Sequence, residues 1–279
     1  MKEGVKECLK ACRDGKLGSI LETAVKAAVA GGDILRELYD KPHQIKHKGA
    51  IDLVTEADVA SEETVIDILQ KAHPDVDVLA EESQSKYERI PQGPVWIIDP
   101  LDGTTNFAHS FPWFGVSIAY AEAGKSKAGV IYLPMQNELF CASLGGGAWL
   151  NGKRIKVSEA AKLKDALLAT GFPYAIHEKT PEVIAALGTV LPKAQGIRRA
   201  GSAALDLAYV ACGRLDGFWE IMLKPWDTAA GLLLVEEAGG KVTDFRGGQY
   251  SPFVPEILAS NGRIHEELTG ILKKFGTVS

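Results

Sequence analysis

The sequence has 279 residues, of which 46% are hydrophobic and 24% are charged, a composition typical of a folded globular protein. The net charge of −5 argues against a surface built for nucleic acid or for an anionic membrane. No apolar run approaches the roughly 20 residues of a membrane-spanning helix, and residues 1–16 lack the apolar core of a secretory signal. We therefore expect a cytoplasmic protein without nucleic-acid or membrane partners.

The four cysteines, Cys8, Cys12, Cys141 and Cys212, are scattered along the chain. Cys8 and Cys12 are four residues apart and would lie near each other on a helix. No further Cys or His follows at metal-binding spacing. Reduced thiols are therefore expected rather than a disulfide or a zinc site.

Two helices are expected near the start of the chain. Residues 19–22 fit a capping box, and apolar side chains at helical spacing follow to about Tyr39. A second helix follows an extended stretch at Ile51–Thr55 and runs to about His73, where a proline stops it. Asp58 lies in its first turn, where a carboxylate stabilises the helix dipole.

Acidic residues follow two short apolar strands. The strand Val76–Ala80 precedes Glu81-Glu82-Ser83, and the strand Val95–Ile98 precedes a turn at Asp99-Pro100-Leu101-Asp102-Gly103. Adjacent carboxylates on a loop are usually only solvated, and an Asp-x-x-Asp-Gly turn is usually a capped turn. Their shared place at strand ends favours a second interpretation, a site for a hard dication such as Mg²⁺.

A helix start follows the second acidic stretch. Gly103-Thr104-Thr105-Asn106 is typical of the first turn of a short helix. The free backbone N–H groups of such a turn bind anions, phosphate above all. A dication beside a phosphate cradle indicates metal-assisted phosphate chemistry.

From Gly115 to Val157 the pattern predicts an antiparallel meander. Strands are expected over residues 116–121, 128–133, 139–143 and 148–157. Asn151-Gly152 is the dipeptide of a type I′ hairpin turn. Because no crossover helix interrupts these strands, the first half of the chain, residues 1–157, is expected to be α+β.

After Ser158 helices and strands alternate, which predicts an α/β half over residues 158–279. Strands are expected over residues 167–170, 197–200, 215–221, 241–245 and 257–260. Helices are expected from an N-cap at Thr180-Pro181, from Gly201-Ser202-Ala203 to Cys212, over 226–237 and over 265–275.

Three motifs together resemble those of the inositol monophosphatase family. DPLDGTTNF at 99–107 resembles the first family signature, and PWDTAAG at 225–231, followed by EAGG at 237–240, resembles the second. LAEES at 79–83 resembles the acidic loop, with Ala80 where the family has glycine. The resemblance spans Ser19 to Ile271. It implies an α+β fold, the layered αβαβα sandwich of the sugar phosphatases, with an antiparallel-sheet N-terminal half and an α/β C-terminal half.

The resemblance also implies a site that binds two or three Mg²⁺ ions. The implied metal ligands are Glu81, Asp99, the carbonyl of Leu101, Asp102 and Asp227. Asp58, Thr104 and Glu81 are implied to act in catalysis, with Thr104, oriented by Asp58, positioning the attacking water. The implied substrate contacts are Asp102, Gly103, Thr104, Gly201, Ser202, Ala203, Glu220 and Asp227.

Two of these assignments have alternatives. Lys48 matches a family lysine near the metals, but neighbouring Lys46 leaves the alignment open. Glu220 alternates with apolar residues in Phe218-Trp219-Glu220-Ile221, as a solvent-facing strand residue would.

The leading hypothesis is a Mg²⁺-dependent phosphatase of small sugar or cyclitol phosphates, with inositol 1-phosphate as the first choice. Enzymes acting on fructose 1,6-bisphosphate or phosphoadenosine phosphate would share the same metal motifs. A regulatory protein that keeps the fold and binds another macromolecule is the alternative from a different class, although the full acidic set argues against loss of catalysis. The resemblance further implies lithium sensitivity and a homodimer.

Overall fold

The computed structural model describes residues 15–41, 46–47, 53–83 and 88–276. Cys8, Cys12 and Lys48 lie outside these residues, as do residues 51 and 52 of the extended stretch expected at 51–55. Lys46 and His47 form β1, a short strand that pairs with β2 (Leu53–Val54). No helix in the described part of the chain is both long enough and apolar enough to cross a membrane.

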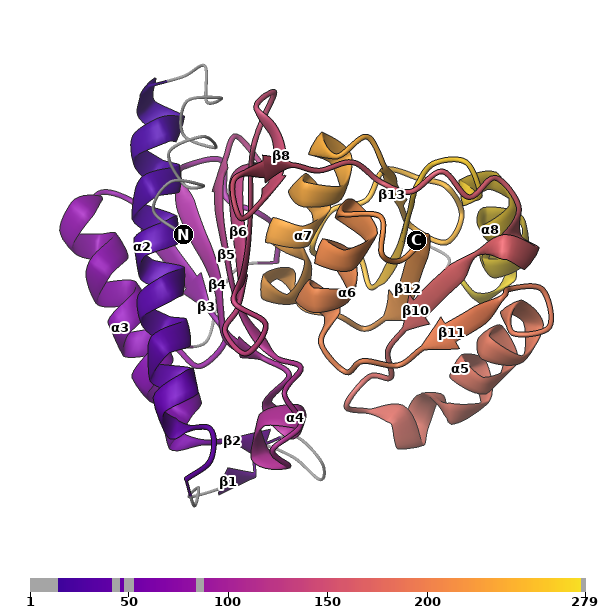
Figure 1. Ribbon diagram of the computed structural model, residues 1–279, viewed down its shortest axis with the longest axis horizontal. Helices are drawn as coiled ribbons and strands as arrows, with labels where there is room; N and C mark the ends of the chain where they lie inside the picture. The colour runs from indigo at the N-terminus through magenta and orange to yellow at the C-terminus, as the bar shows by residue number, and fades with distance from the viewer. Residues whose placement is uncertain (1–14, 42–45, 48–52, 84–87, 277–279) are drawn as a thin grey trace.

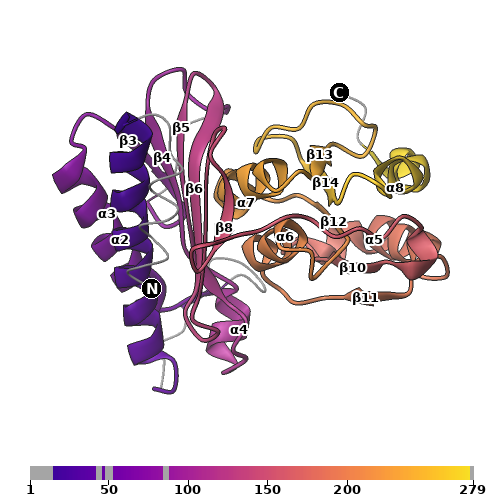
Figure 2. The same ribbon diagram turned by 45° about the horizontal axis from the view of Figure 1, so that its top comes forward.

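Helices and sheets alternate in five layers (Figure 1, Figure 2). Helices α2 (Gly15–Leu38) and α3 (Glu56–Ala72) cover the outer face of a seven-stranded sheet. Helices α6 (Ala203–Ala211) and α7 (Pro225–Glu237) lie between that sheet and a five-stranded one. Helices α5 (Ile176–Val190) and α8 (His265–Leu272) cover the far face of the second sheet. This arrangement confirms the predicted αβαβα sandwich.

The first sheet is the predicted meander, which begins at residue 115, with two earlier strands added at one edge. Its order is β3 (Asp77–Ala80), β4 (Val95–Asp102), β5 (Gly115–Glu122), β6 (Lys125–Leu133), β7 (Glu138–Ser143), β8 (Gly147–Leu150) and β9 (Lys153–Arg154). Only β3 and β4 run parallel. Asn151 and Gly152 have φ angles of 48° and 76°, as the predicted type I′ turn requires.

The second sheet is mixed. Its order is β11 (Gly196–Arg198), β10 (Leu167–Thr170), β12 (Gly217–Ile221), β14 (Glu256–Ser260) and β13 (Lys241–Thr243). Strand β10 runs parallel to both β11 and β12, whereas β14 is antiparallel to both β12 and β13. A 3₁₀ turn (Leu163–Asp165) precedes β10, and another (Lys273–Phe275) follows α8.

Because side chains alternate between the two faces of a strand, one sheet contributes residues to two hydrophobic cores. Val95 and Ile97 pack towards α6 and α7, whereas Trp96 and Ile98 pack towards α2 and α3. Because both faces are covered by helices, residues 95–98 of β4 are all apolar. This is why this part of the strand reads as a continuous apolar run rather than an alternating one.

Two predicted helix starts are wrong. Helix α2 begins at Gly15, and Ser19 lies inside it, with its carbonyl accepting a hydrogen bond from the Thr23 hydroxyl at 3.0 Å. Leu17 packs against the core, and this burial extends the helix to residues that precede the capping-box pattern. Helix α5 begins at Ile176, and its exposed face accommodates Pro181 because water can reach the carbonyl that proline leaves unpaired.

Several strand bounds also differ from the prediction. The Asn151-Gly152 turn divides the strand expected at 148–157 into β8 and β9, β6 begins at Lys125 rather than at 128, β11 spans 196–198 rather than 197–200, and β12 begins at Gly217 rather than at 215. Strand β4 does not stop at Ile98 but continues pairing to Asp102, with a register shift between Asp99 and Asp102. Such a bulge re-aims side chains without ending the strand. In the second sheet, β13 stops at Thr243, two residues before the expected end. The division of the chain near residue 158 stays a prediction.

Candidate active site

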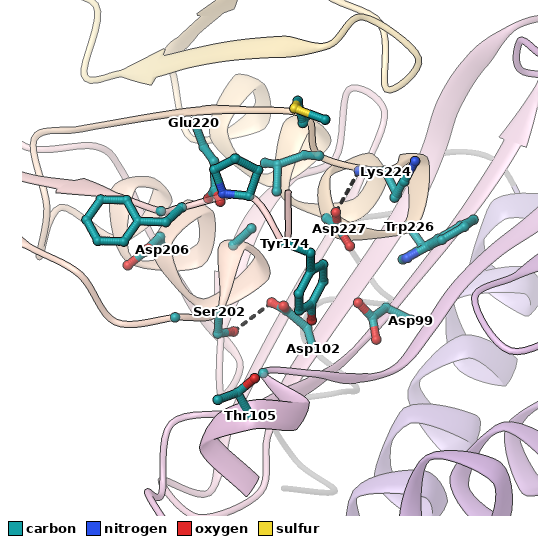
Figure 3. Close-up of a pocket in the computed structure, with 18 of the residues that line it drawn as sticks. Asp99, Asp102, Thr105, Tyr174, Ser202, Asp206, Glu220, Lys224, Trp226 and Asp227 are labelled. Carbon is teal, nitrogen blue, oxygen red and sulfur yellow. Dashed lines mark hydrogen bonds between the residues drawn. The ribbon is translucent and has the colours of Figure 1, made fainter. Parts of the chain in front are cut away.

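A cavity of about 410 Å³ opens between the two sheets, where strand ends meet the starts of α6 and α7. Figure 3 shows the carboxylates of Asp99, Asp102 and Asp227 around one part of it, with Glu220 and Asp206 in another. The predicted site residues that line the cavity are Glu81, Asp99, Leu101, Asp102, Gly103, Gly201, Ser202, Ala203, Glu220 and Asp227. Asp58 and Thr104 are buried and do not line it.

Parallel pairing of β3 and β4 brings the first two carboxylates together. Ala80 pairs with Ile98, so Glu81 and Asp99 leave the same edge of the sheet. Asp99 is 2% exposed, and its Oδ1 accepts a hydrogen bond from the Leu101 N–H at 3.0 Å. This contact is the one expected of a capped Asp-x-x-Asp-Gly turn, and the buried Asp99 also lines the cavity.

Asp102 joins the two halves of the chain. Its Oδ2 accepts hydrogen bonds from the Ser202 hydroxyl at 2.6 Å and from the Ala204 N–H at 2.7 Å (Figure 3). Ser202 is also the N-cap of α6, since its Oγ accepts from the Leu205 N–H at 3.3 Å. The start of α6 thus holds a carboxylate that lies 100 residues away in sequence.

Only glycine can occupy position 103 without backbone strain. Its φ angle is +98°, and a Cβ there would lie 3.0 Å from the Trp113 carbonyl. It precedes the short helix α4 (Thr104–Ala108), as predicted. The cavity therefore borders a helix start, although α4 is only five residues long.

Asp58 makes two contacts, one at the start of α3 and one to Thr104. Its Oδ2 accepts from the Thr55 N–H at 2.8 Å and completes a capping box at the start of α3. Its Oδ1 accepts from the hydroxyl of Thr104 at 2.9 Å, across 46 residues. This contact is the pairing that the family resemblance implied.

Asp227 lies in the first turn of α7. Its Oδ2 accepts from the Lys224 N–H at 2.6 Å (Figure 3). Glu220, at the end of β12, is 7% exposed, so the alternative of a solvent-facing strand residue is wrong. The period of two explains its direction, because Phe218 packs into the core around α6 and α7 and Glu220 shares its face.

Burial dominates the electrostatics of the site. It raises the pKa of Asp102 to about 6, although hydrogen bonds from Ser202 and from the backbone of Ala204 and Ala203 oppose this change. The pKa of Asp99 is raised well above its usual value by burial and by the charges of Glu81, Asp102 and Asp227. The pKa of Asp227 is raised in the same way, by burial and then by the charges of Asp102 and Glu81. The cavity thus concentrates acidic groups in a poorly solvated space.

The sequence matches the model of the inositol monophosphatase family over residues 16–276. The chain belongs to the inositol monophosphatase family. Escherichia coli strain K12 has a relative named Nus factor SuhB, 44% identical over 265 residues that cover 91% of this chain and 99% of that protein. A Synechocystis relative named inositol-1-monophosphatase is 44% identical over 257 residues, covering 90% of this chain and 88% of that protein.

Solved structures of the family agree with this fold. The inositol monophosphatase from Anabaena has a TM-score of 0.84 and 43% identity, covering 93% of this chain and 97% of its own. The extragenic suppressor protein SuhB from Bartonella henselae has a TM-score of 0.86 and 43% identity, covering 91% and 98%. Members with both names therefore resemble this chain to a similar degree.

The donor set of the inositol monophosphatase cavity suits a hard dication. Its carboxylates are buried (Asp99) or half-buried, and the pKa values of Asp99 and Asp227 are raised by neighbouring carboxylates, so a cation would relieve this repulsion. Among the described residues, however, no three His, Cys, Asp or Glu side chains are arranged as ready ligands of one metal ion. Mg²⁺ keeps several waters, which suits carboxylates spaced around a cavity. The individual metal ligands stay a prediction.

Sequence reasoning missed three residues that shape this site. Asn106 donates its amide to the Ala200 carbonyl at 2.9 Å and so ties α4 to the segment before Gly201. Glu62 is buried and accepts from the Glu82 N–H at 2.9 Å, which holds the acidic loop. Asp206, in α6, lines the cavity. Each acts across a long sequence separation or from inside a helix, where local patterns carry no signal.

Proposed function

We propose that this chain is a Mg²⁺-dependent phosphatase of small phosphorylated polyols, with inositol 1-phosphate as its substrate. One observation carries the proposal: Glu81, Asp99, Asp102 and Asp227 line a single cavity that also contains the buried Glu220. Acidic groups suited to a dication and a group suited to hydroxyls are thus placed side by side. Family membership agrees with this assignment.

In this proposal Mg²⁺ is held by Glu81, Asp99, Asp102 and Asp227, with the Leu101 carbonyl as a further ligand. The metal supplies Lewis-acid stabilisation of the developing charge and a more acidic bound water. Phosphoryl transfer depends mainly on positioning and electrostatics, so the carboxylates contribute chiefly by setting where positive charge can reside.

The chain's own groups then orient the reactants. The Thr104 hydroxyl donates its hydrogen to Asp58, which leaves the Oγ1 lone pairs to accept a hydrogen bond from the attacking water. Backbone N–H groups at Gly103 and Thr104 hold the phosphate. Glu220 accepts hydrogen bonds from hydroxyls of the leaving alcohol.

Phosphate release by the purified protein tests this function. The panel contains inositol 1-phosphate, fructose 1,6-bisphosphate and a phosphoadenosine phosphate, each with Mg²⁺ and with chelator. We expect release that requires Mg²⁺ and is fastest for inositol 1-phosphate. Faster release from either of the other esters would replace the substrate assignment and keep the enzyme class.

The variant Asp227→Asn tests the metal site itself. Removal of this charge is expected to reduce kcat by about two powers of ten or more, the scale of positioned charges in active sites. Asp165→Asn, at an exposed position outside the cavity, is the matched control and should retain activity. Near-normal turnover of Asp227→Asn at saturating Mg²⁺ would exclude Asp227 as a ligand.

A second candidate function is favoured by the relatives named Nus factor SuhB, such as the Escherichia coli protein that is 44% identical to this chain. It is a regulatory role in which the same fold binds another macromolecule. The net charge of −5 gives no support for a nucleic-acid surface. Absence of phosphate release from the whole panel at saturating Mg²⁺ would favour this role over the enzyme. A homodimer, also proposed from the family, is measured by light scattering of the purified chain.

A further inference from the structure

Asp206 is a buried carboxyl group that the described residues leave without a partner. It lies in the first turns of α6, is 2% exposed and lines the cavity (Figure 3). Its Oδ1 atom is fully covered and makes no hydrogen bond. A buried polar atom without a partner costs folding free energy, so its presence calls for an explanation.

The surroundings of Asp206 do not compensate for its burial. Its pKa is raised well above the usual value, first by burial and then by the charges of Glu220 and Asp102, while Arg199 lowers it. The Arg199 guanidinium stacks over Phe172, 5.1 Å from the ring centroid, and Oδ1 of Asp206 receives no hydrogen bond from it. Two acidic side chains, Asp206 and Glu220, therefore share one part of the cavity and lack a hydrogen-bond donor from the described chain.

We infer that Asp206 and Glu220 together recognise hydroxyl groups of the leaving alcohol, which makes Asp206 a further specificity-determining residue. Carboxyl oxygens accept hydrogen bonds from hydroxyls, and a diol supplies one donor to each group. An alcohol without hydroxyls leaves both carboxyl groups unpaired in a buried site, so it binds poorly in the transition state. This inference rests on the proposed phosphatase function.

A ligand-binding role and a structural role predict opposite effects on stability. If Asp206 serves the ligand, the free protein carries the cost of its burial, and Asp206→Asn leaves the melting temperature unchanged or raises it. If Asp206 supports the fold, the same substitution lowers the melting temperature. Asp216 is the matched structural control, since it is 9% exposed and accepts hydrogen bonds from the Ser158 hydroxyl at 2.5 Å and the Leu167 N–H at 2.6 Å.

The test compares two phosphate esters that differ only in ring hydroxyls, inositol 1-phosphate and cyclohexyl phosphate. Both are assayed at saturating Mg²⁺ with wild type, Asp206→Asn, Glu220→Gln and Asp216→Asn. We expect Asp206→Asn and Glu220→Gln each to lower the ratio of the two kcat/KM values at least tenfold. Asp216→Asn is expected to lower the melting temperature and keep the ratio within twofold of wild type.

A double variant adds a measure of coupling. If both carboxyl groups contact the same diol, Asp206→Asn combined with Glu220→Gln lowers the ratio by less than the product of the single effects. A ratio within twofold of wild type for Asp206→Asn would overturn the inference. So would a fall in its melting temperature as large as that of Asp216→Asn.

The failure of the inference is distinguishable from the failure of the proposed function. Wild-type protein that hydrolyses both esters, together with an unchanged ratio in Asp206→Asn, overturns the inference alone. Wild-type protein that releases no phosphate from either ester with Mg²⁺ overturns the proposed function and the inference with it.

Discussion

A Cβ on residue 171 would lie 2.0 Å from Oε2 of Glu220, so the carboxyl group occupies the space that Gly171 leaves open. The sheet register explains this closeness. Thr170 at the end of β10 pairs with Trp219 of β12, which places Gly171 beside Glu220. Both lie on the face that carries Ala169 and Phe218, next to the middle helices. Gly171 thereby decides where the Glu220 carboxyl group points.

Gly171→Ala is therefore expected to move Glu220 without unfolding the chain. The clashing atoms are at the far end of a flexible side chain, and the φ angle of Gly171 is not in the left-handed region, so the backbone tolerates alanine. We expect kcat/KM for inositol 1-phosphate to fall at least tenfold, with little change in melting temperature. Gly188→Ala, in α5 with open space at its Cβ, is the control and should keep full activity.

Equal activity of Gly171→Ala and Gly188→Ala would show that the position of the Glu220 carboxyl group does not affect turnover. Steady-state kinetics and thermal melting on the three proteins suffice for this comparison.

Thr104 offers a second prediction, because its hydroxyl contacts Asp58 at 2.9 Å and the Leu101 carbonyl at 3.1 Å. Thr104→Val keeps the shape and removes the hydroxyl, so it is expected to lower kcat by about two powers of ten. Thr104→Ser restores the hydroxyl and is expected to recover most of the activity. A serine variant as inactive as the valine variant would indicate that the methyl group, rather than the hydroxyl, is what the site needs.

Lithium provides a third prediction. Li⁺ is close to Mg²⁺ in size and carries half its charge, so it can take a weakly held metal position without equivalent stabilisation of the leaving group. We expect millimolar Li⁺ to inhibit phosphate release, most strongly when Mg²⁺ is limiting. The same rates with Na⁺ and with Li⁺ at equal ionic strength would contradict this expectation.

His265 predicts how stability depends on pH. Its Nδ1 contacts the Ser260 hydroxyl and its Nε2 the Thr243 hydroxyl, both at 2.9 Å. Burial, assisted by Lys241, lowers its pKa to about 4 from a usual value of 6.5. Between these values the unfolded chain binds more protons than the folded one, so stability falls as the pH falls from about 6.5 towards 4.

Urea unfolding between pH 7.5 and pH 5 measures this effect. His265→Gln is expected to lower stability at pH 7.5 and to weaken the loss of stability at lower pH. His177→Gln, at an exposed position, should follow the wild-type profile. Parallel profiles for wild type and His265→Gln would assign the pH dependence to other groups.

Local sequence patterns were sufficient for the order of the elements and for the acidic strand ends. Strand β10 matches its predicted bounds, Gly103 precedes the predicted short helix, and Asn151-Gly152 forms the predicted hairpin turn. Such features depend on side-chain period, caps and turn chemistry, which act within a few residues. The helix starts at Ser19 and Pro181 were wrong because burial and exposure, which are tertiary properties, override a local cap.

The tertiary structure alone decided which groups meet. Parallel pairing of β3 with β4 sets Glu81 beside Asp99, and α6 delivers Ser202 to Asp102 across 100 residues. The alternation of side chains along a strand predicts that β12 has two faces. Which face is buried is decided by packing, and α6 and α7 cover the face that carries Glu220. Asp206 lies among apolar residues of α6 in the sequence. Its burial and its lack of a hydrogen-bond partner become visible only once the two sheets are packed around that helix.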